Sequence, residues 1–162
     1  MQITRGRQNS PYKIVLYGVE GIGKTTFAAQ FPDPLFIDTE GSTARMDVAR
    51  LDKPSSWAHL ADMVNFVIRE KPCGTLVIDT ADWAEVLAKE YVISSGGEKI
   101  KSIEDFGYGK GYTMIAEQYG RFLNKLTDVT NAGINVVVTA HAMMRKFEQP
   151  DEMGAYDRWE LK

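Results

Sequence analysis

Four short runs of apolar residues recur along the chain, and none has the three- and four-residue spacing of a helix. They are residues 12–17, 34–38, 75–79 and 134–140. Their short length and the proline and glycine residues around them predict buried β-strands. Because the runs are apolar throughout, we expect both faces of the sheet to be covered, as in parallel sheets.

Three longer segments place apolar residues at the spacing of an amphipathic helix. We expect the first helix to begin at Ser55 or Ser56 and to end before Pro72, and the second to open at Asp82. A further short helix stops at Pro32. The three apolar faces are Trp57, Leu60, Val64 and Val67; Trp83, Val86, Leu87 and Tyr91; and Ile115, Tyr119, Phe122, Leu126 and Val129. Strands separated by helices predict a three-layer α/β fold with a mostly parallel central sheet.

Three stretches lack such a pattern. Residues 94–112 contain five glycines and residues 142–158 show no sustained period, so we expect both to be mobile loops. We expect residues 1–10, which carry charge but no apolar segment, to be flexible.

Size and composition limit the classes of protein. A chain of 162 residues and 18.2 kDa, with 44% hydrophobic and 25% charged residues, predicts one globular domain over residues 1–162. The net charge of −3 gives no bulk attraction to nucleic acid, and a single cysteine excludes a disulfide scaffold. No apolar run reaches the roughly 20 residues of a membrane span, so we expect a cytoplasmic protein without membrane contact.

The stretch GVEGIGKT, residues 18–25, satisfies the phosphate-loop pattern G-x-x-x-x-G-K-[ST] between a predicted strand and a predicted helix. Its glycines let backbone N–H groups converge on a polyphosphate, Lys24 adds a point charge, and the Thr25 hydroxyl is a Mg²⁺ ligand. The sequence therefore predicts a site for a nucleotide and Mg²⁺. The expected nucleotide-binding residues are Gly18, Val19, Glu20, Gly21, Ile22, Gly23, Lys24, Thr25 and Thr26.

Two predicted strands end alike, in FIDT and VIDT. Asp38 is followed two residues later by Glu40, on the same side of an extended segment, and such a carboxylate pair suits the activation of an attacking water. Asp79 stands alone after four apolar residues, which suits a metal ligand. We therefore expect Glu40 to be catalytic and Asp79 to bind Mg²⁺.

The motifs GVEGIGKT, FIDTEGS, LVIDT and VVVTAH, in this order, resemble the core of the RecA-like recombinase ATPases. With the stretch FGYGKGY, residues 10–160 are similar to RecA-like phage and prophage nucleotide-binding proteins, some of which act in single-strand annealing and recombination. The resemblance implies an ATPase that uses Mg²⁺. Because RecA-like cores usually continue with more strands, it also implies a core that is shortened at its C-terminus.

Position by position, the resemblance implies that Lys24 and Thr25 are ligands of the phosphates and Mg²⁺. It also implies that Glu40 is the catalytic glutamate and that Asp79 lies near the metal. His141 falls where RecA-like proteins commonly carry a glutamine that senses the nucleotide. An imidazole can donate a hydrogen bond to a phosphate oxygen, so we count His141 among the catalytic candidates.

In the recombinases, two loops face single-stranded DNA, and their counterparts here are residues 97–112 and 142–158. Both mix cations with aromatic residues, as sequence-tolerant single-strand sites do, but acids nearly balance the cations. The first set is Lys99, Lys101, Phe106, Tyr108, Lys110 and Tyr112, and the second is Arg145, Lys146, Phe147 and Tyr156. We expect weak single-stranded DNA binding that a homo-oligomer would strengthen.

Two alternatives stay open. A small-molecule or nucleotide kinase shares the phosphate loop but closes a basic lid over its acceptor, and here the cations near the C-terminus are few and scattered. A binding module that does not hydrolyse its nucleotide is the other. A GTPase is disfavoured, because the nearest string to a guanine reader, residues 124–127, ends in Thr127 rather than aspartate.

Overall fold

The structure is a computed structural model that describes residues 3, 5, 6, 10–148 and 155–161. Its central sheet contains β1 (Lys13–Gly18), β2 (Pro34–Asp38), β3 (Ala49–Arg50), β4 (Thr75–Asp79) and β5 (Asn135–Glu148) in the order β1-β5-β4-β2-β3, with every pair on this path parallel. A sixth strand, β6 (Ala155–Leu161), runs antiparallel to the outer part of β5. The strands therefore present their carboxyl ends at one edge, where ligands bind in such sheets.

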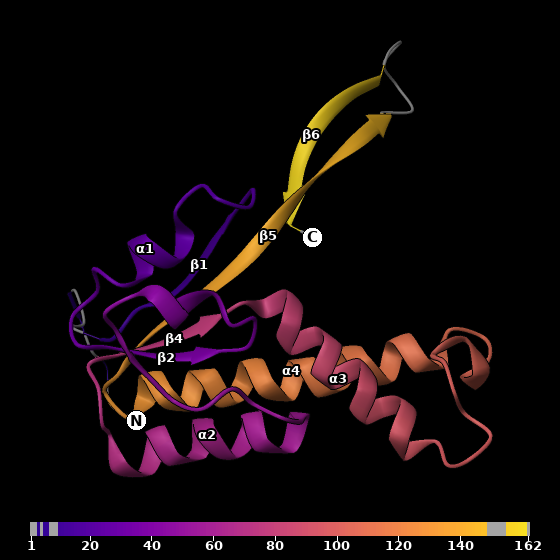
Figure 1. The fold of residues 1–162 in the computed structure, drawn as a ribbon, viewed down its shortest axis with the longest axis horizontal. Coiled ribbons are helices and arrows are strands. Elements are labelled where there is room, and N and C mark those ends of the chain that lie inside the picture. Colours follow the sequence, from indigo (N-terminus) through magenta and orange to yellow (C-terminus); the bar gives the residue numbers. More distant parts are fainter. Residues whose placement is uncertain (1–2, 4, 7–9, 149–154, 162) are drawn as a thin grey trace.

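Helices cover both faces of the sheet (Figure 1). The large core packs α2 (Trp57–Glu70), α3 (Ala81–Ser95) and α4 (Lys110–Asn131) against one face. The short α1 (Lys24–Ala28) covers the other, where Ala28 contacts Phe36, Val77 and Val137. The three-layer α/β fold expected from the apolar runs is confirmed.

The predicted segments and the observed elements agree closely in the first two thirds of the chain. The strands of residues 34–38 and 75–79 have the predicted bounds. Ser56, rather than Ser55, caps α2 by accepting a hydrogen bond from the His59 N–H, and Lys71 ends the helix before Pro72. The cap of α3 is Thr80, so Asp82 lies inside the first turn instead of opening the helix.

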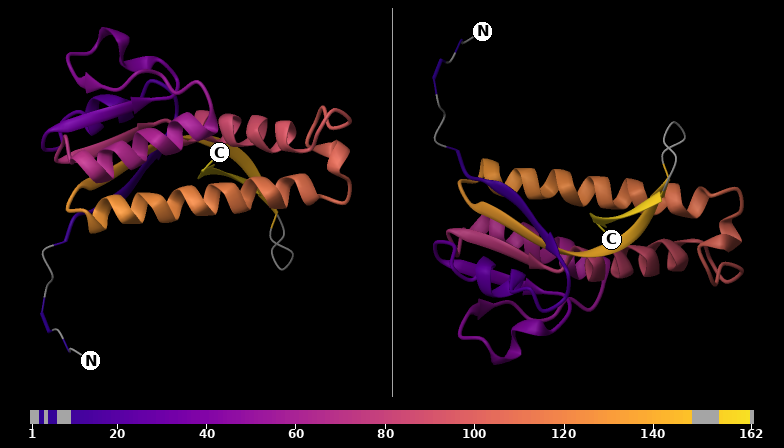
Figure 2. Two further views of the ribbon diagram at one scale, coloured as in Figure 1. Left: turned by 90° about the horizontal axis from the view of Figure 1, so that it is seen from below. Right: turned by 90° about the horizontal axis from the view of Figure 1, so that it is seen from above.

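The expectation of a loop over residues 142–158 is wrong for its described part. β5 continues to Glu148 and pairs with β6, so that the two strands form an arm that projects from the sheet (Figures 1 and 2). Met144 lies opposite Trp159, and Ala142 opposite Leu161, on one face of this arm. Residues 149–154 lie outside the described residues, as do most of residues 1–10, whose flexibility stays a prediction.

The expectation of an irregular loop over residues 94–112 holds only in part. The helix α3 continues to Ser95, a 3-10 turn, η2, spans Glu104–Phe106, and α4 begins at Lys110. Asp105 fixes the segment by accepting hydrogen bonds from the N–H groups of Lys101 and Ser102, both at 2.8 Å. The glycine content of this stretch predicted an irregular loop, but local caps and turns give much of it a regular structure.

Among the described residues, no helix is long and apolar enough to cross a membrane.

Candidate nucleotide-binding site

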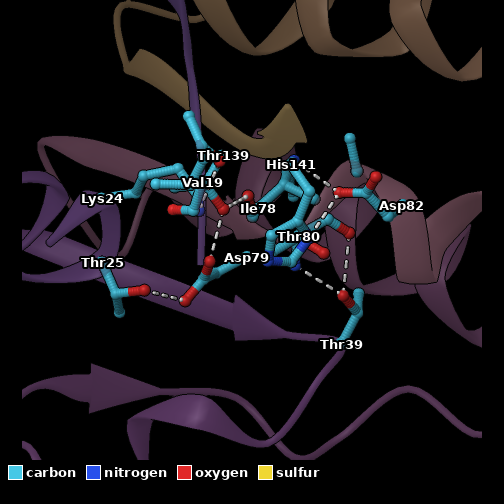
Figure 3. Close-up of polar contacts among 12 residues, drawn as sticks. Val19, Lys24, Thr25, Thr39, Ile78, Asp79, Thr80, Asp82, Thr139 and His141 are labelled. Atoms are coloured by element: carbon cyan, nitrogen blue, oxygen red, sulfur yellow. Dashed lines mark hydrogen bonds and ion pairs between the residues drawn. The ribbon is translucent and has the colours of Figure 1, made fainter. Parts of the chain in front are cut away.

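The phosphate loop connects β1 to α1 and bends at Gly21 and Gly23, where φ is 76° and 97°. These left-handed conformations favour glycine, which explains the fixed glycine of the motif at position 23 and the additional glycine at position 21. The Lys24 ammonium donates hydrogen bonds to the carbonyl oxygens of Gly18 and Val19, at 3.1 and 3.0 Å (Figure 3). The loop thus folds around its own cation. Because α1 has only five residues, we attribute the attraction for anions to the loop N–H groups and Lys24 more than to a helix dipole.

Asp79 joins three elements at the carboxyl end of β4. Its fully buried carboxylate accepts hydrogen bonds from the Thr25 hydroxyl at 2.9 Å, from the Ser42 hydroxyl at 2.8 Å, and from the Thr139 hydroxyl. Thr25 lies in the first turn of α1, and Thr139 lies on β5. Ser42 begins a 3-10 turn, η1 (Ser42–Arg45). The two residues expected to bind Mg²⁺, Thr25 and Asp79, are thus in direct contact.

The expectation that Asp38 and Glu40 act as a pair is wrong. Asp38 turns away from the loop and accepts hydrogen bonds from the N–H groups of Gly41, Ser42 and Thr43 and from the Thr43 hydroxyl, at 2.5 to 3.2 Å. Burial alone favours the neutral acid, but these hydrogen bonds outweigh it and hold the pKa of Asp38 below its usual value. Asp38 therefore shapes the turn that follows β2.

Glu40 stands apart from that network. It is half-buried, and within the described part of the chain its carboxylate makes no hydrogen bond or ion pair. Its main chain is held at both ends, because its N–H donates to the Asp79 carbonyl at 3.4 Å and its own carbonyl accepts from the Lys53 ammonium at 3.3 Å. The backbone is therefore anchored while the side-chain carboxylate stays available.

His141 lies where β5 leaves the sheet, opposite Gly18 of the loop. Its Nδ1 is 3.0 Å from Oδ2 of Asp82, and its backbone N–H donates to the same oxygen at 2.9 Å (Figure 3). Asp82 on α3 therefore orients the ring, with Nδ1 as the donor and the second ring nitrogen left for other partners. This arrangement fits a residue that presents its imidazole to a ligand.

One pocket of about 310 Å³ brings most of the predicted site residues together. The loop contributes one wall and the strand ends contribute the other. Its lining includes the predicted residues Glu20, Gly21, Gly23, Lys24, Thr25, Thr26, Glu40, Asp79 and His141, together with Ser42, Met46 and Thr80. Of the predicted set, Gly18, Val19 and Ile22 lie in the loop but do not line this pocket. Their predicted contact with phosphates has no counterpart in the pocket wall.

The oxygen donors in this pocket fit Mg²⁺. This ion takes oxygen ligands and keeps several waters, so that a protein commonly supplies one or two carboxylates and the substrate supplies phosphates. Asp79 and the Thr25 hydroxyl provide such a set. The described residues contain no group of three or more His, Cys, Asp or Glu side chains that could hold a metal without a nucleotide. The site therefore suits a metal that arrives with polyphosphate.

Besides Met46 and Thr80 of the pocket lining, three side chains that hydrogen-bond to predicted site residues were missed by sequence reasoning. Ser42 and Thr139 bond to Asp79, and Asp82 bonds to His141. Ser42 closes the string FIDTEGS, and Thr139 is the threonine of VTAH in a predicted strand, so their nearness to the strand ends was the only available signal. A hydroxyl group in a turn or strand has no periodic pattern that marks it as functional.

A glycine loop that closes on a lysine after β1, beside a buried aspartate at the end of β4 in the same parallel sheet, defines the class of P-loop nucleotide-binding proteins. Residues 10–162 match the AAA domain family, and the chain belongs to that family. Proteins of this family are usually ATPases, and their P-loop domains generally bind ATP and Mg²⁺. No curated protein matches the chain.

Proposed function

We propose that the protein is a Mg²⁺-dependent ATPase of RecA-like type. One observation carries the proposal: a single pocket is lined by the loop residues Lys24 and Thr25 and by the strand-end carboxylates of Glu40 and Asp79. Phosphate binding, metal binding and water activation each need one of these groups. The strand order adds support, because β5 between β1 and β4 places His141 beside the same pocket.

The residues divide the chemistry as follows. Lys24 and the loop N–H groups bind the phosphates and stabilise the charge that grows on their oxygens. Glu40 accepts a proton from the water that attacks the terminal phosphorus in line, while the bond to the bridging oxygen of the β-phosphate breaks. Thr25 and Asp79 would hold Mg²⁺, which when bound neutralises phosphate charge. His141, whose Nδ1 donates to Asp82, donates to a phosphate oxygen from its second ring nitrogen as an imidazolium, because in the neutral ring that nitrogen carries no proton.

We further propose that this ATPase acts on single-stranded DNA, in recombination or annealing, and derives from a phage or prophage. The support is the resemblance of its motifs and the exposure of aromatic residues beside cations. Tyr108 is fully exposed between the exposed Lys101 and Lys110, and Trp159 on the arm is 53% exposed. Two DNA-facing surfaces, the α3–α4 connection and the arm, are thus candidates, and a homo-oligomer would align several copies of them.

Steady-state ATP hydrolysis, with and without single-stranded DNA, tests this proposal. We expect Glu40→Gln to lower kcat by about 10²-fold or more, because an amide cannot accept the proton. Glu117→Gln, on the exposed side of α4, is the matched control and should hydrolyse ATP like the wild type. Wild-type turnover by Glu40→Gln would exclude Glu40 as the base. If DNA changes neither turnover nor ATP affinity, the recombination role is wrong.

A kinase remains the second candidate because of one further pocket. A cavity of about 650 Å³ adjoins the phosphate site and shares Glu20, Glu40 and His141 with it. Trp83 and Met143 also line it, so a small acceptor molecule could bind next to the terminal phosphate. Product analysis decides: a phosphorylated small molecule favours the kinase, and inorganic phosphate alone favours the ATPase.

A further inference from the structure

One buried hydroxyl group near the phosphate loop has no partner. Among the described residues, Thr80 Oγ1 is the only buried side-chain nitrogen or oxygen without a hydrogen bond. Thr80 is 2% exposed. Its backbone is satisfied, since its N–H donates to the Thr39 hydroxyl at 2.8 Å and its carbonyl accepts from that hydroxyl at 2.9 Å (Figure 3). Only the hydroxyl is left over.

The usual structural use of such a threonine does not apply. Thr80 is the N-cap of α3, a position where a threonine hydroxyl normally accepts a hydrogen bond from an N–H of the first turn. Here the side chain makes no cap hydrogen bond. A buried polar group without a partner destabilises a fold, so each one calls for an explanation outside the chain's own packing.

The position of Thr80 supplies that explanation. It lines the pocket that also holds Lys24, Thr25 and Asp79. Loop residues form one wall of this pocket and strand-end residues the other. Because the loop cradles the inner phosphates, the terminal phosphate of a bound nucleotide would extend toward the strand-end wall. A hydroxyl donor on that wall matches the charged oxygens of such a group.

We infer that Thr80 is a nucleotide-binding residue whose hydroxyl donates a hydrogen bond to the terminal phosphate of a bound nucleoside triphosphate. The inference rests on the proposed ATP site and adds a contact that discriminates triphosphate from diphosphate. It also explains why the hydroxyl is buried without a partner among the described residues: the ligand is its partner.

Thr80→Val tests this directly, because valine keeps the shape of threonine and removes only the hydroxyl. Binding of a non-hydrolysable ATP analogue and of ADP is measured with Mg²⁺ present. We expect the variant to bind the analogue about 10- to 100-fold more weakly, the worth of a hydrogen bond to a charged group, and ADP within about 2-fold of the wild type. Thr80→Ser, which keeps the hydroxyl, should recover most of the affinity.

A second readout needs no nucleotide. Removing an unpaired buried hydroxyl should raise the Tm of the nucleotide-free protein, by about 2–4 °C. Thr113→Val, on the exposed surface of α4, controls for the exchange of threonine for valine and should change neither Tm nor affinity appreciably. A lower Tm for Thr80→Val would show that the hydroxyl has a partner in the free protein and would count against the inference.

The outcomes separate this inference from the proposed function. Tight binding of the analogue by Thr80→Val would overturn the inference and leave the ATP site intact. Equal losses for the analogue and ADP would also overturn it, because the contact would not be with the terminal phosphate. If the wild type binds neither nucleotide, the proposed function is wrong and the inference falls with it.

Discussion

At the scale of single residues, the two aspartates that end β2 and β4 have different roles although they lie side by side in the sheet. Asp38 and Asp79 are paired in register, and both are buried. Asp38 receives its hydrogen bonds from the turn directly after it, whereas Asp79 receives them from three separate elements. The first carboxylate therefore organises local structure, and the second organises the site.

This division could be predicted only in part from the sequence. Asp79, Lys24 and Thr25 come from motifs whose spacing has a chemical reason, so they could be located before the fold was known. The role of Asp38 could not, because FIDT and VIDT are nearly identical strings. What separates them is the turn that follows one strand and the helix that follows the other.

Acid stability tests the role of Asp38. Because its folded pKa lies below the unfolded value of 3.8, the ionised carboxylate stabilises the fold fully above about pH 4, and this contribution is lost as the pH falls through the folded pKa. We expect Asp38→Asn to lower the free energy of unfolding at pH 7 by about 1–3 kcal/mol and to flatten its decline in acid. Denaturant unfolding from pH 7 to pH 3 measures both. An acid decline as steep in the variant as in the wild type would contradict this account.

At the scale of elements, helices and strands with one buried face could be predicted from the sequence, whereas those without a buried face could not. The helix α4 has a single apolar face that packs Tyr119 and Phe122 against Trp57 of α2. The arm is different, because Met144 and Trp159 are each more than half exposed on its surface. Without a core to contact, neither strand of the arm needs a regular alternation, and the pairing becomes visible only in three dimensions.

Two tryptophans provide a matched comparison of these elements. Trp57 is 8% exposed and stacks on Tyr119 with ring centroids 6.0 Å apart, whereas Trp159 is 53% exposed on the arm. We expect Trp57→Ala to cost about 3–5 kcal/mol in denaturant unfolding, as for other large core side chains. Trp159→Ala should cost less than about 1 kcal/mol, the worth of a cross-strand pair. A comparable loss in both variants would show that the arm unfolds together with the core.

At the scale of the whole molecule, the fold gathers its chemistry at one edge, and the two candidate DNA surfaces differ in how they connect to that edge. The connection that carries Tyr108 lies at the far end of the α3–α4 pair, separated from the pocket by the 15 residues of α3, about 22 Å (Figure 1). The arm begins at His141 itself, since β5 runs without a break from the pocket into it. The arm is therefore the candidate DNA surface that is directly continuous with the nucleotide site.

A nucleotide in this pocket should stabilise the whole molecule, because Asp79 and its hydroxyl partners tie α1, η1, β4 and β5 together there. A ligand at 100 times its Kd adds about 2.7 kcal/mol, which for a domain of this size raises Tm by about 5–10 °C. We expect that shift for the wild type with Mg²⁺ and ATP, and little shift for Lys24→Ala or with EDTA, since either removes a charge that holds the phosphates. Thermal unfolding followed by circular dichroism measures it. An equal shift in Lys24→Ala would show that the nucleotide binds outside the loop. The chemistry proposed for Glu40 and Asp79 at the strand ends would then be wrong as well.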